Sequence, residues 1–367
     1  MDILSTLRAR RDEFTEKRHI PADAVDLLKK LGCYRAFVPR SFGGLEMAPA
    51  DFCRLVEDIA TADASAGWVS SFGVSTFYLS RLPSETFAKI YADGPDVVFA
   101  GALFPPQVAT IDGDRIGITG RWKYCSGVMG ASMVGVGVRH DSWDKDAQPF
   151  TAVLPARDIT IHQNWQAIGL RATGSHDISV TDKTVTRDWM FARNAKPSID
   201  IPLYRYPLMC LVPQSMAAVG LGTAREALDT LAATARGEAS ITGAISLDQR
   251  GYVLADLARA TAMLEAARSH FYGTIEEAWA SVLAGVEPDV AGRNKLRLAA
   301  THAAHTAAEV TRMAFVAGGT RAIAGGHALG RCMNDAACVA QHATLGEGNW
   351  TAAGGVMLTG EPGAGYP

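Results

Sequence analysis

His342 is the residue of this sequence best suited by type to acid–base chemistry. It follows Gln341 at the end of a predicted helix. Imidazole is the side chain whose unperturbed pKa lies near neutrality, so it can polarise a substrate hydroxyl or N–H group or protonate a leaving oxygen. His176, beside a Thr-Gly-Ser turn, is a weaker second candidate. For an arbitrary histidine, a surface position or a hydrogen-bonded place in the core is the more frequent role.

Small hydroxyl residues and glycines gather in two segments, 120–127 and 169–177. The first ends a predicted strand at Ser126 and Gly127. The second holds Thr173 and Ser175 in a turn whose hydroxyls and backbone N–H groups can contact a ligand. The alternative is that Ser126 and Gly127 only terminate the strand.

Other familiar sites are missing from the sequence. There is no G-x-S-x-G hydrolase elbow, no G-x-x-x-x-G-K-[ST] phosphate loop and no G-x-G-x-x-G after a strand. The histidines and cysteines near residues 302–305 and 332–342 do not match a zinc spacing, so we expect no metal site. Guanidinium groups pair well with phosphates, which makes three arginines candidates for a cofactor's phosphates: Arg121, Arg171 and Arg236.

Composition narrows the class of protein. The chain has 367 residues and a net charge of -3, with Lys+Arg 35 against Asp+Glu 38, so it lacks the basic surplus of a nucleic-acid-binding protein. No apolar run is long enough to span a membrane. The six cysteines are sparse and the chain starts with a charged segment instead of a signal sequence, so we expect a reduced, cytoplasmic protein.

The elements that position these residues follow a helix, strand, helix order. Apolar spacing predicts helices up to about residue 91, and an Asp112-Gly113 turn lies among several predicted strands. Long Ala-rich helices follow, then a Gly/Pro-rich irregular tail from Gly354. We expect three domains: 1–96 helical, 97–204 β-barrel-like and 205–367 a helical bundle with the tail. The predicted strands are 97–103, 108–111, 115–124, 133–138, 150–154, 159–162 and 178–185, and the predicted late helices are 216–235, 247–283, 293–317 and 334–345.

Three segments in this order, 38–44, 120–127 and 169–177, resemble the acyl-CoA dehydrogenase fold family over essentially the whole chain. The resemblance implies an α+β fold: an N-terminal helical domain, a middle antiparallel β-domain and a C-terminal four-helix bundle.

Within that family, segments 63–68, 122–127 and 335–342 are similar to the flavin-dependent monooxygenases that receive reduced flavin from a separate reductase. A frequent position of the dehydrogenases' catalytic glutamate is Ala343 here. Glu347, between two glycines, is expected in an exposed turn. The 102–107 loop lacks the dehydrogenases' acid and also departs from the hydroxylases' usual loop.

The resemblance implies roles for particular residues. Reduced FAD or FMN would react with O2 to a flavin hydroperoxide that must be kept dry and hydrogen-bonded. Ser126 would lie near the flavin N5 as a catalytic residue together with His342. The residues expected to bind the cofactor are Trp122, Tyr124, Ser126, Gly127, Thr173, Ser175 and Arg236, with Trp122 and Tyr124 flanking the ring and Arg236 serving a neighbouring subunit.

The substrate is expected to be a small aromatic of the indole or phenol type, hydroxylated or epoxidised. Trp68, Phe104 and Tyr204 are the expected pocket walls, although aromatic side chains are more often plain core. The family also implies a homotetramer. Two alternatives stay open: an acyl-CoA dehydrogenase or oxidase, and a non-catalytic flavin-binding or assembly subunit.

Overall fold

Seven α-helices form the first part of the chain, as the apolar spacing predicts. The computed structural model describes residues 2–140, 143, 149–236, 245–363 and 366. The helix at residues 22–30 starts after Pro21, buries Leu28 and is followed by Gly32 at φ 85°. The helices are α1 (Ile3–Ala9), α2 (Arg11–Lys17), α3 (Ala22–Lys30), α4 (Pro49–Ala62), α5 (Ala64–Ser70), α6 (Ser75–Leu79) and α7 (Ser84–Ile90).

The middle of the chain forms two four-stranded sheets, ordered β1-β4-β5-β8 and β2-β3-β7-β6. The predicted Asp112-Gly113 hairpin is confirmed, because Asp112 pairs with Arg115 and Gly113 has φ 59°. β1 and β4 pair in parallel, since the chain crosses to the second sheet before it returns. The strands are β1 (Phe99–Val108), β2 (Thr110–Asp112), β3 (Arg115–Cys125), β4 (Met133–Arg139), β5 (Phe150–Pro155), β6 (Thr160–His162), β7 (His176–Thr186) and β8 (Met190–Ala192).

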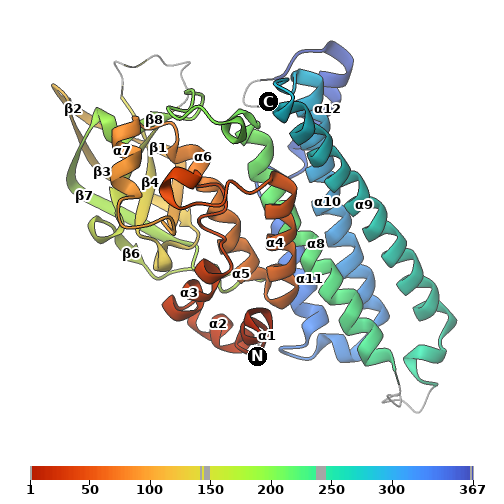
Figure 1. Ribbon diagram of the computed structural model, residues 1–367. Coiled ribbons are helices and arrows are strands. Elements are labelled where there is room, and N and C mark those ends of the chain that lie inside the picture. The colour runs from red at the N-terminus through yellow and green to blue at the C-terminus, as the bar shows by residue number, and fades with distance from the viewer. Residues whose placement is uncertain (1, 141–142, 144–148, 237–244, 364–365, 367) are drawn as a thin grey trace.

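The last part of the chain is a bundle of long helices beside the sheets, with α4 and α5 between the two (Figure 1). α8 begins eight residues before the expected Met216 and contains Pro213. A proline cannot donate to the carbonyl four residues earlier, and here Arg297 Nη1 donates to that carbonyl, Met209 O, at 3.0 Å. The helices are α8 (Leu208–Ala235), α9 (Gly251–Leu283), α10 (Val290–Ala317), α11 (Ala328–Ala340) and α12 (Gly348–Thr359).

The prediction of an irregular tail from Gly354 is wrong for its first residues. α12 continues to Thr359 because Ala353 and Val356 are buried and Asn294 Nδ2 donates to the Ala353 carbonyl at 3.2 Å. Tertiary packing therefore overcomes the low helix propensity of glycine. Residues 364, 365 and 367 of the predicted tail lie outside the described part.

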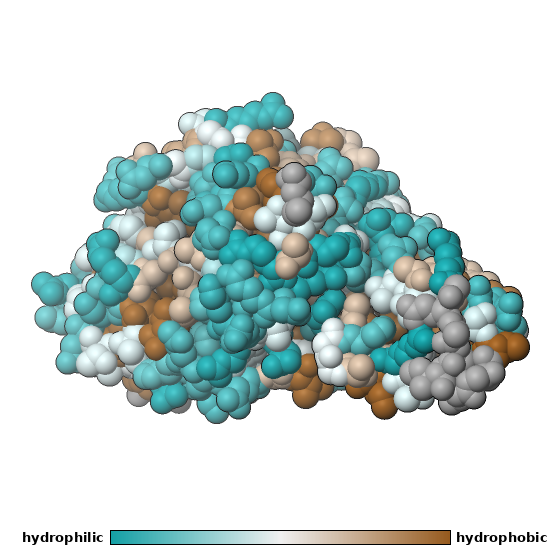
Figure 2. Space-filling view, turned by 90° about the horizontal axis from the view of Figure 1, so that it is seen from below, coloured by the Kyte–Doolittle hydropathy of each residue, from teal (hydrophilic) through white to brown (hydrophobic). Residues whose placement is uncertain are grey.

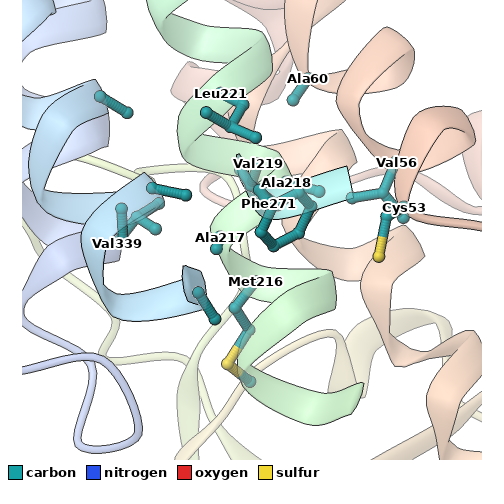
Figure 3. Close-up of a cluster of buried hydrophobic side chains, with 14 of the residues drawn as sticks. Cys53, Val56, Ala60, Met216, Ala217, Ala218, Val219, Leu221, Phe271 and Val339 are labelled. Carbon is teal, nitrogen blue, oxygen red and sulfur yellow. The ribbon is translucent and has the colours of Figure 1, made fainter. Parts of the chain in front are cut away.

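The bundle packs on α4 at very short backbone distances. Side chains from α4, α8, α9 and α11 meet in one cluster, in which Phe271 of α9 lies between α8 and Val56 of α4 (Figure 3). A Cβ added to Gly222 of α8 would lie 2.1 Å from the Glu57 carbonyl oxygen, so only glycine fits there. The position of α8 is thus fixed by contact with α4.

The exposed face shown in Figure 2 is mainly hydrophilic, with hydrophobic residues scattered among polar ones. In the described part of the chain, no helix is both long and apolar enough to cross a bilayer.

Two buried carboxylates lie where the bundle meets the loop before β7. Asp335 of α11 accepts the Leu170 N–H at 2.6 Å, and Asp63 caps α5 by accepting the Ala66 N–H at 2.8 Å. Burial raises the pKa of both carboxyls, that of Asp335 to about 7. A Cβ on Gly169 would lie 2.2 Å from Asn334 O, so the loop lies directly on α11.

This burial makes stability depend on pH through Asp335. Between the ordinary carboxyl pKa of 3.8 and about 7, the folded protein keeps a proton that the unfolded chain loses, so this group lowers stability as pH rises. Asp335→Asn keeps an oxygen for the Leu170 N–H and cannot ionise. We therefore expect the unfolding free energy of Asp335→Asn, minus that of the parent, to grow from pH 4 to pH 7 in denaturant titrations. Asp114→Asn, at an exposed carboxylate, is the control, and a pH-independent difference for Asp335→Asn would contradict the prediction.

Candidate active site

The two hydroxyl segments of the sequence meet at the end of β3. β3 and β7 are antiparallel neighbours with Cys125 opposite His176, which brings the turn after β3 against the turn before β7. The Gly127 N–H donates to the Thr173 carbonyl at 2.8 Å, and Gly127 has φ 73°, a conformation that favours glycine. The structure therefore brings together Ser126, Gly127, Thr173 and Ser175.

Three hydroxyls form a row there. Ser126 Oγ lies 2.6 Å from Ser175 Oγ, which lies 2.7 Å from Thr173 Oγ1. Thr173 Oγ1 donates to the Leu170 carbonyl at 3.0 Å, so its single proton is used. Ser175 must then donate to Thr173, and Ser126 must donate to Ser175. The row leaves Ser126 Oγ with lone pairs free for an outside donor.

The aromatic residues of β3 have different surroundings. Tyr124, at φ 61°, is 68% exposed beside Ser126, with its ring centroid 6.2 Å from that of Trp165. Trp122 is fully buried between the sheets, and its Nε1–H donates to the Gly137 carbonyl at 2.9 Å. A ring held inside the β-domain cannot lie against a cofactor outside it, so the site we propose retains Tyr124 and omits Trp122.

His342 lies in the turn after α11, beside another predicted residue. Its ring centroid is 5.5 Å from the ring of Trp68 of α5. The Thr344 N–H donates to Nδ1 at 3.3 Å, which leaves the ring proton on Nε2. Burial lowers the pKa of His342 to about 4, so the imidazole is neutral at physiological pH and offers an N–H donor. Thr344, which orients this ring, was missed by the sequence analysis because no motif marks it.

The second histidine candidate is held in a different way. His176 is buried and accepts the Trp165 N–H on Nδ1 at 3.0 Å, while its Nε2 has no partner in the described part of the chain. Burial lowers the pKa of His176, which favours the neutral imidazole at the start of β7.

The other two predicted pocket residues, Tyr204 and Phe104, are held by other contacts. Tyr204 is 5% exposed, packs on Phe77 and donates its hydroxyl to the Phe37 carbonyl at 3.1 Å. The ring and the hydroxyl of Tyr204 thus both have partners within the core, and we omit this residue from the site. Phe104 of β1 is 53% exposed and carries the Arg193 guanidinium over its ring, 5.6 Å from the centroid.

The arginine candidates have varied surroundings. Arg121 pairs with Asp177 at 3.0 Å, and Arg171 is exposed. Arg236 occupies the C-cap position of α8, and this end of the helix points away from the β-domain (Figure 1).

Carboxylates that could remove a substrate proton are not found in the turn after α11. Ala343 is exposed, and Glu347 is exposed at the start of α12, as its flanking glycines predict. Asp335 is buried with its Oδ1 bound to the Leu170 N–H. Among the residues with described positions, no three of His, Cys, Asp and Glu cluster as metal ligands.

The chain is similar to proteins of one family along its whole length. The acyl-CoA dehydrogenase N-terminal domain model matches residues 5–91, and the C-terminal domain model matches residues 214–347. An indole-3-acetate monooxygenase from Pseudomonas putida is 48% identical over 98% of this chain and 92% of its own. The flavin-dependent monooxygenase oxygenase subunit HsaA from Rhodococcus jostii is 27% identical over 93% of this chain and 92% of its own.

The fold of this chain is also similar to that of a solved structure. The crystal structure of 3-HSA hydroxylase from Rhodococcus sp. RHA1 has a TM-score of 0.91 and 25% identity, and covers 99% of this chain and 96% of that chain. The fold, the two matched domains and the near-full-length relatives agree with one another. This chain belongs to the acyl-CoA dehydrogenase family and, within it, to the flavin-dependent monooxygenases.

Proposed function

We propose that this monooxygenase uses O2 and reduced FAD or FMN, delivered by a separate reductase, to hydroxylate or epoxidise indole-3-acetate or a closely related aromatic. The observation that carries the proposal is the oriented row of hydroxyls ending at Ser126. The 48% identical indole-3-acetate monooxygenase supports the substrate, and the HsaA oxygenase subunit supports the separate reductase.

The residues at the end of β3 fit a reduced flavin. When bound, a reduced flavin supplies the electrons for activating O2. Its central ring carries an N–H group at N5, which is a donor. Ser126 Oγ is left as an acceptor by the row behind it, so it can hold that N–H. Tyr124 is free to cover the ring, and the Gly127 turn, with Thr173 and Ser175, fixes the position of Ser126.

His342 and Trp68 would form the substrate side. The neutral imidazole keeps its Nδ1 occupied by Thr344, which leaves its proton on Nε2 for a different partner. It can therefore donate to an oxygen of the reacting group or to a substrate atom. Trp68, 6% exposed, closes one side of this ring and helps to exclude water.

We further propose a homotetramer in the cytoplasm. The outer side of α9 exposes Tyr252 and Leu254, at 55% and 52%, which suits contact with a second copy. Arg236 would then reach a cofactor of the neighbouring subunit. All six cysteines are free thiols, as in a reducing compartment.

The function predicts a product that depends on a reductase. With NADH, a flavin reductase, FAD or FMN, O2 and indole-3-acetate, we expect an oxygenated indole product of increased mass by mass spectrometry. Omitting the reductase should abolish product, and chemically reduced flavin should restore it. Flavin reoxidation that yields hydrogen peroxide alone, across indole and phenol substrates, would contradict the proposal. An acyl-CoA panel under anaerobic conditions tests dehydrogenation, and we expect no flavin bleaching.

Ser126→Ala removes the acceptor and should uncouple the reaction. We expect product per NADH to fall by roughly 10- to 100-fold while hydrogen peroxide release rises, because one polar contact to the reacting region is lost. Ser132→Ala, whose hydroxyl donates to Val98 at 3.2 Å, is the matched control and should stay coupled. Unchanged coupling in Ser126→Ala would count against the assignment.

His342 should act without ionising in the physiological range. Its pKa of about 4 keeps it neutral from pH 5.5 to pH 8, so the pH profile of kcat should show no limb from this group. His342→Gln retains an N–H donor and should keep far more turnover than His342→Leu. A limb near pH 6.5 that disappears in His342→Gln would show that the charged form is used instead.

A further inference from the structure

Arg193 is an arginine without a carboxylate partner in the described part of the chain. It follows β8, and its guanidinium lies over the rings of Tyr78 and Phe104, 5.9 and 5.6 Å from their centroids. Nη2 lies 3.4 Å from the Tyr78 hydroxyl and 3.6 Å from the Met209 sulfur. Nε is buried and has no acceptor among the described residues. The aromatic and sulfur contacts do not neutralise its charge.

A second arginine adds to the same positive charge. Arg81, just after α6, donates from Nε to the Arg193 carbonyl at 3.1 Å and from Nη1 to the Phe77 carbonyl. Burial lowers the pKa of Arg81, and the nearby charge of Arg193 lowers it further. Neither guanidinium has a carboxylate partner among the described residues, and two such charges near each other are costly unless an anion from outside joins them.

One face of α8 connects Arg193 to the surroundings of His342. Met209 and Met216 are seven residues apart and share that face, about 10 Å from each other along the helix. Arg193 contacts the sulfur of Met209, and the Thr344 hydroxyl lies 3.8 Å from the sulfur of Met216. Thr344 in turn contacts His342 Nδ1 at 2.9 Å. Arg193 and His342 therefore lie toward the two ends of this face, Arg193 by direct contact with Met209 and His342 through Thr344.

We propose that Arg193, with Arg81 behind it, binds the carboxylate of an arylacetic acid substrate whose ring extends along Met209 and Met216 toward His342. Phe104, half-exposed with the Arg193 guanidinium over its ring, would then lie beside the bound carboxylate. A guanidinium suits the task because it binds a carboxylate through two parallel hydrogen bonds. This inference rests on the proposed function and names the group that recognises the substrate.

The test compares two substrates of similar shape that differ chiefly in charge. Indole-3-acetate carries the carboxylate, and indole-3-acetamide is a neutral molecule of nearly the same shape. The readout is the ratio of their kcat/KM values in the complete system with reductase and flavin. We expect wild type to prefer the acid and Arg193→Gln to lose that preference by roughly 10- to 100-fold, mainly through a higher KM for the acid. Arg193→Lys should recover part of the preference.

Arg187→Gln is the matched control, because Arg187 lies six residues earlier and faces Asp114 at 3.9 Å. It should keep the wild-type ratio. If Arg193 only braced β8 against α6 and α8, Arg193→Gln would slow both substrates equally and keep the ratio, which would overturn the inference. A wild-type ratio near one would also overturn it. Wild type that converts neither indole substrate would instead contradict the proposed function.

Discussion

The hydrogen bond from the Leu170 N–H to Asp335 holds the loop before β7 against the helical bundle. The carbonyl of the same residue accepts from the Thr173 hydroxyl and from Trp165 Nε1, at 3.0 and 3.1 Å. Leu170 is therefore bound through both backbone groups while it has φ 48°. Because the neighbouring Gly169 lies directly on α11, the strand turn and the bundle are positioned as one unit. The orientation of the hydroxyls at Ser126 depends on this contact.

Much of the fold could be predicted because it follows from local patterns. The period-2 segments, the Asp112-Gly113 turn and the Ala-rich helices each carry their own signal. The β3 and β7 pairing that joins Ser126 to Ser175 is not local and was not predicted; the family resemblance implied only that residues of both segments bind the cofactor. Sequence patterns underestimated the effect of packing on two helices. α12 forms despite its glycines because its buried face contacts α10. α8 tolerates Pro213 because Arg297 donates a hydrogen bond to the Met209 carbonyl, which Pro213 cannot bind.

The aromatic residues show the limit of inference from residue type. Trp122 and Tyr124 are two positions apart and should share one face of β3. A register irregularity between Trp122 and Cys125, with Tyr124 at positive φ, turns Tyr124 outward while Trp122 stays inside. Tyr204 and Trp68 are both buried, and only the contacts distinguish a core ring from one beside His342. No sequence pattern marks Arg193, because the feature that distinguishes it is the lack of a carboxylate partner among the described residues, which only the structure shows.

The direction of the hydroxyl row limits what Ser126 can do with protons. A backbone carbonyl accepts a hydrogen bond and has no proton to donate, so the chain of hydrogen bonds ends at the Leu170 carbonyl. The row cannot relay protons from solvent, because reversing the direction of its hydrogen bonds would require Thr173 to break its bond to the Leu170 carbonyl. The three side chains behave as a fixed dipole with its negative end at Ser126. Any proton needed to complete turnover must therefore arrive by another route.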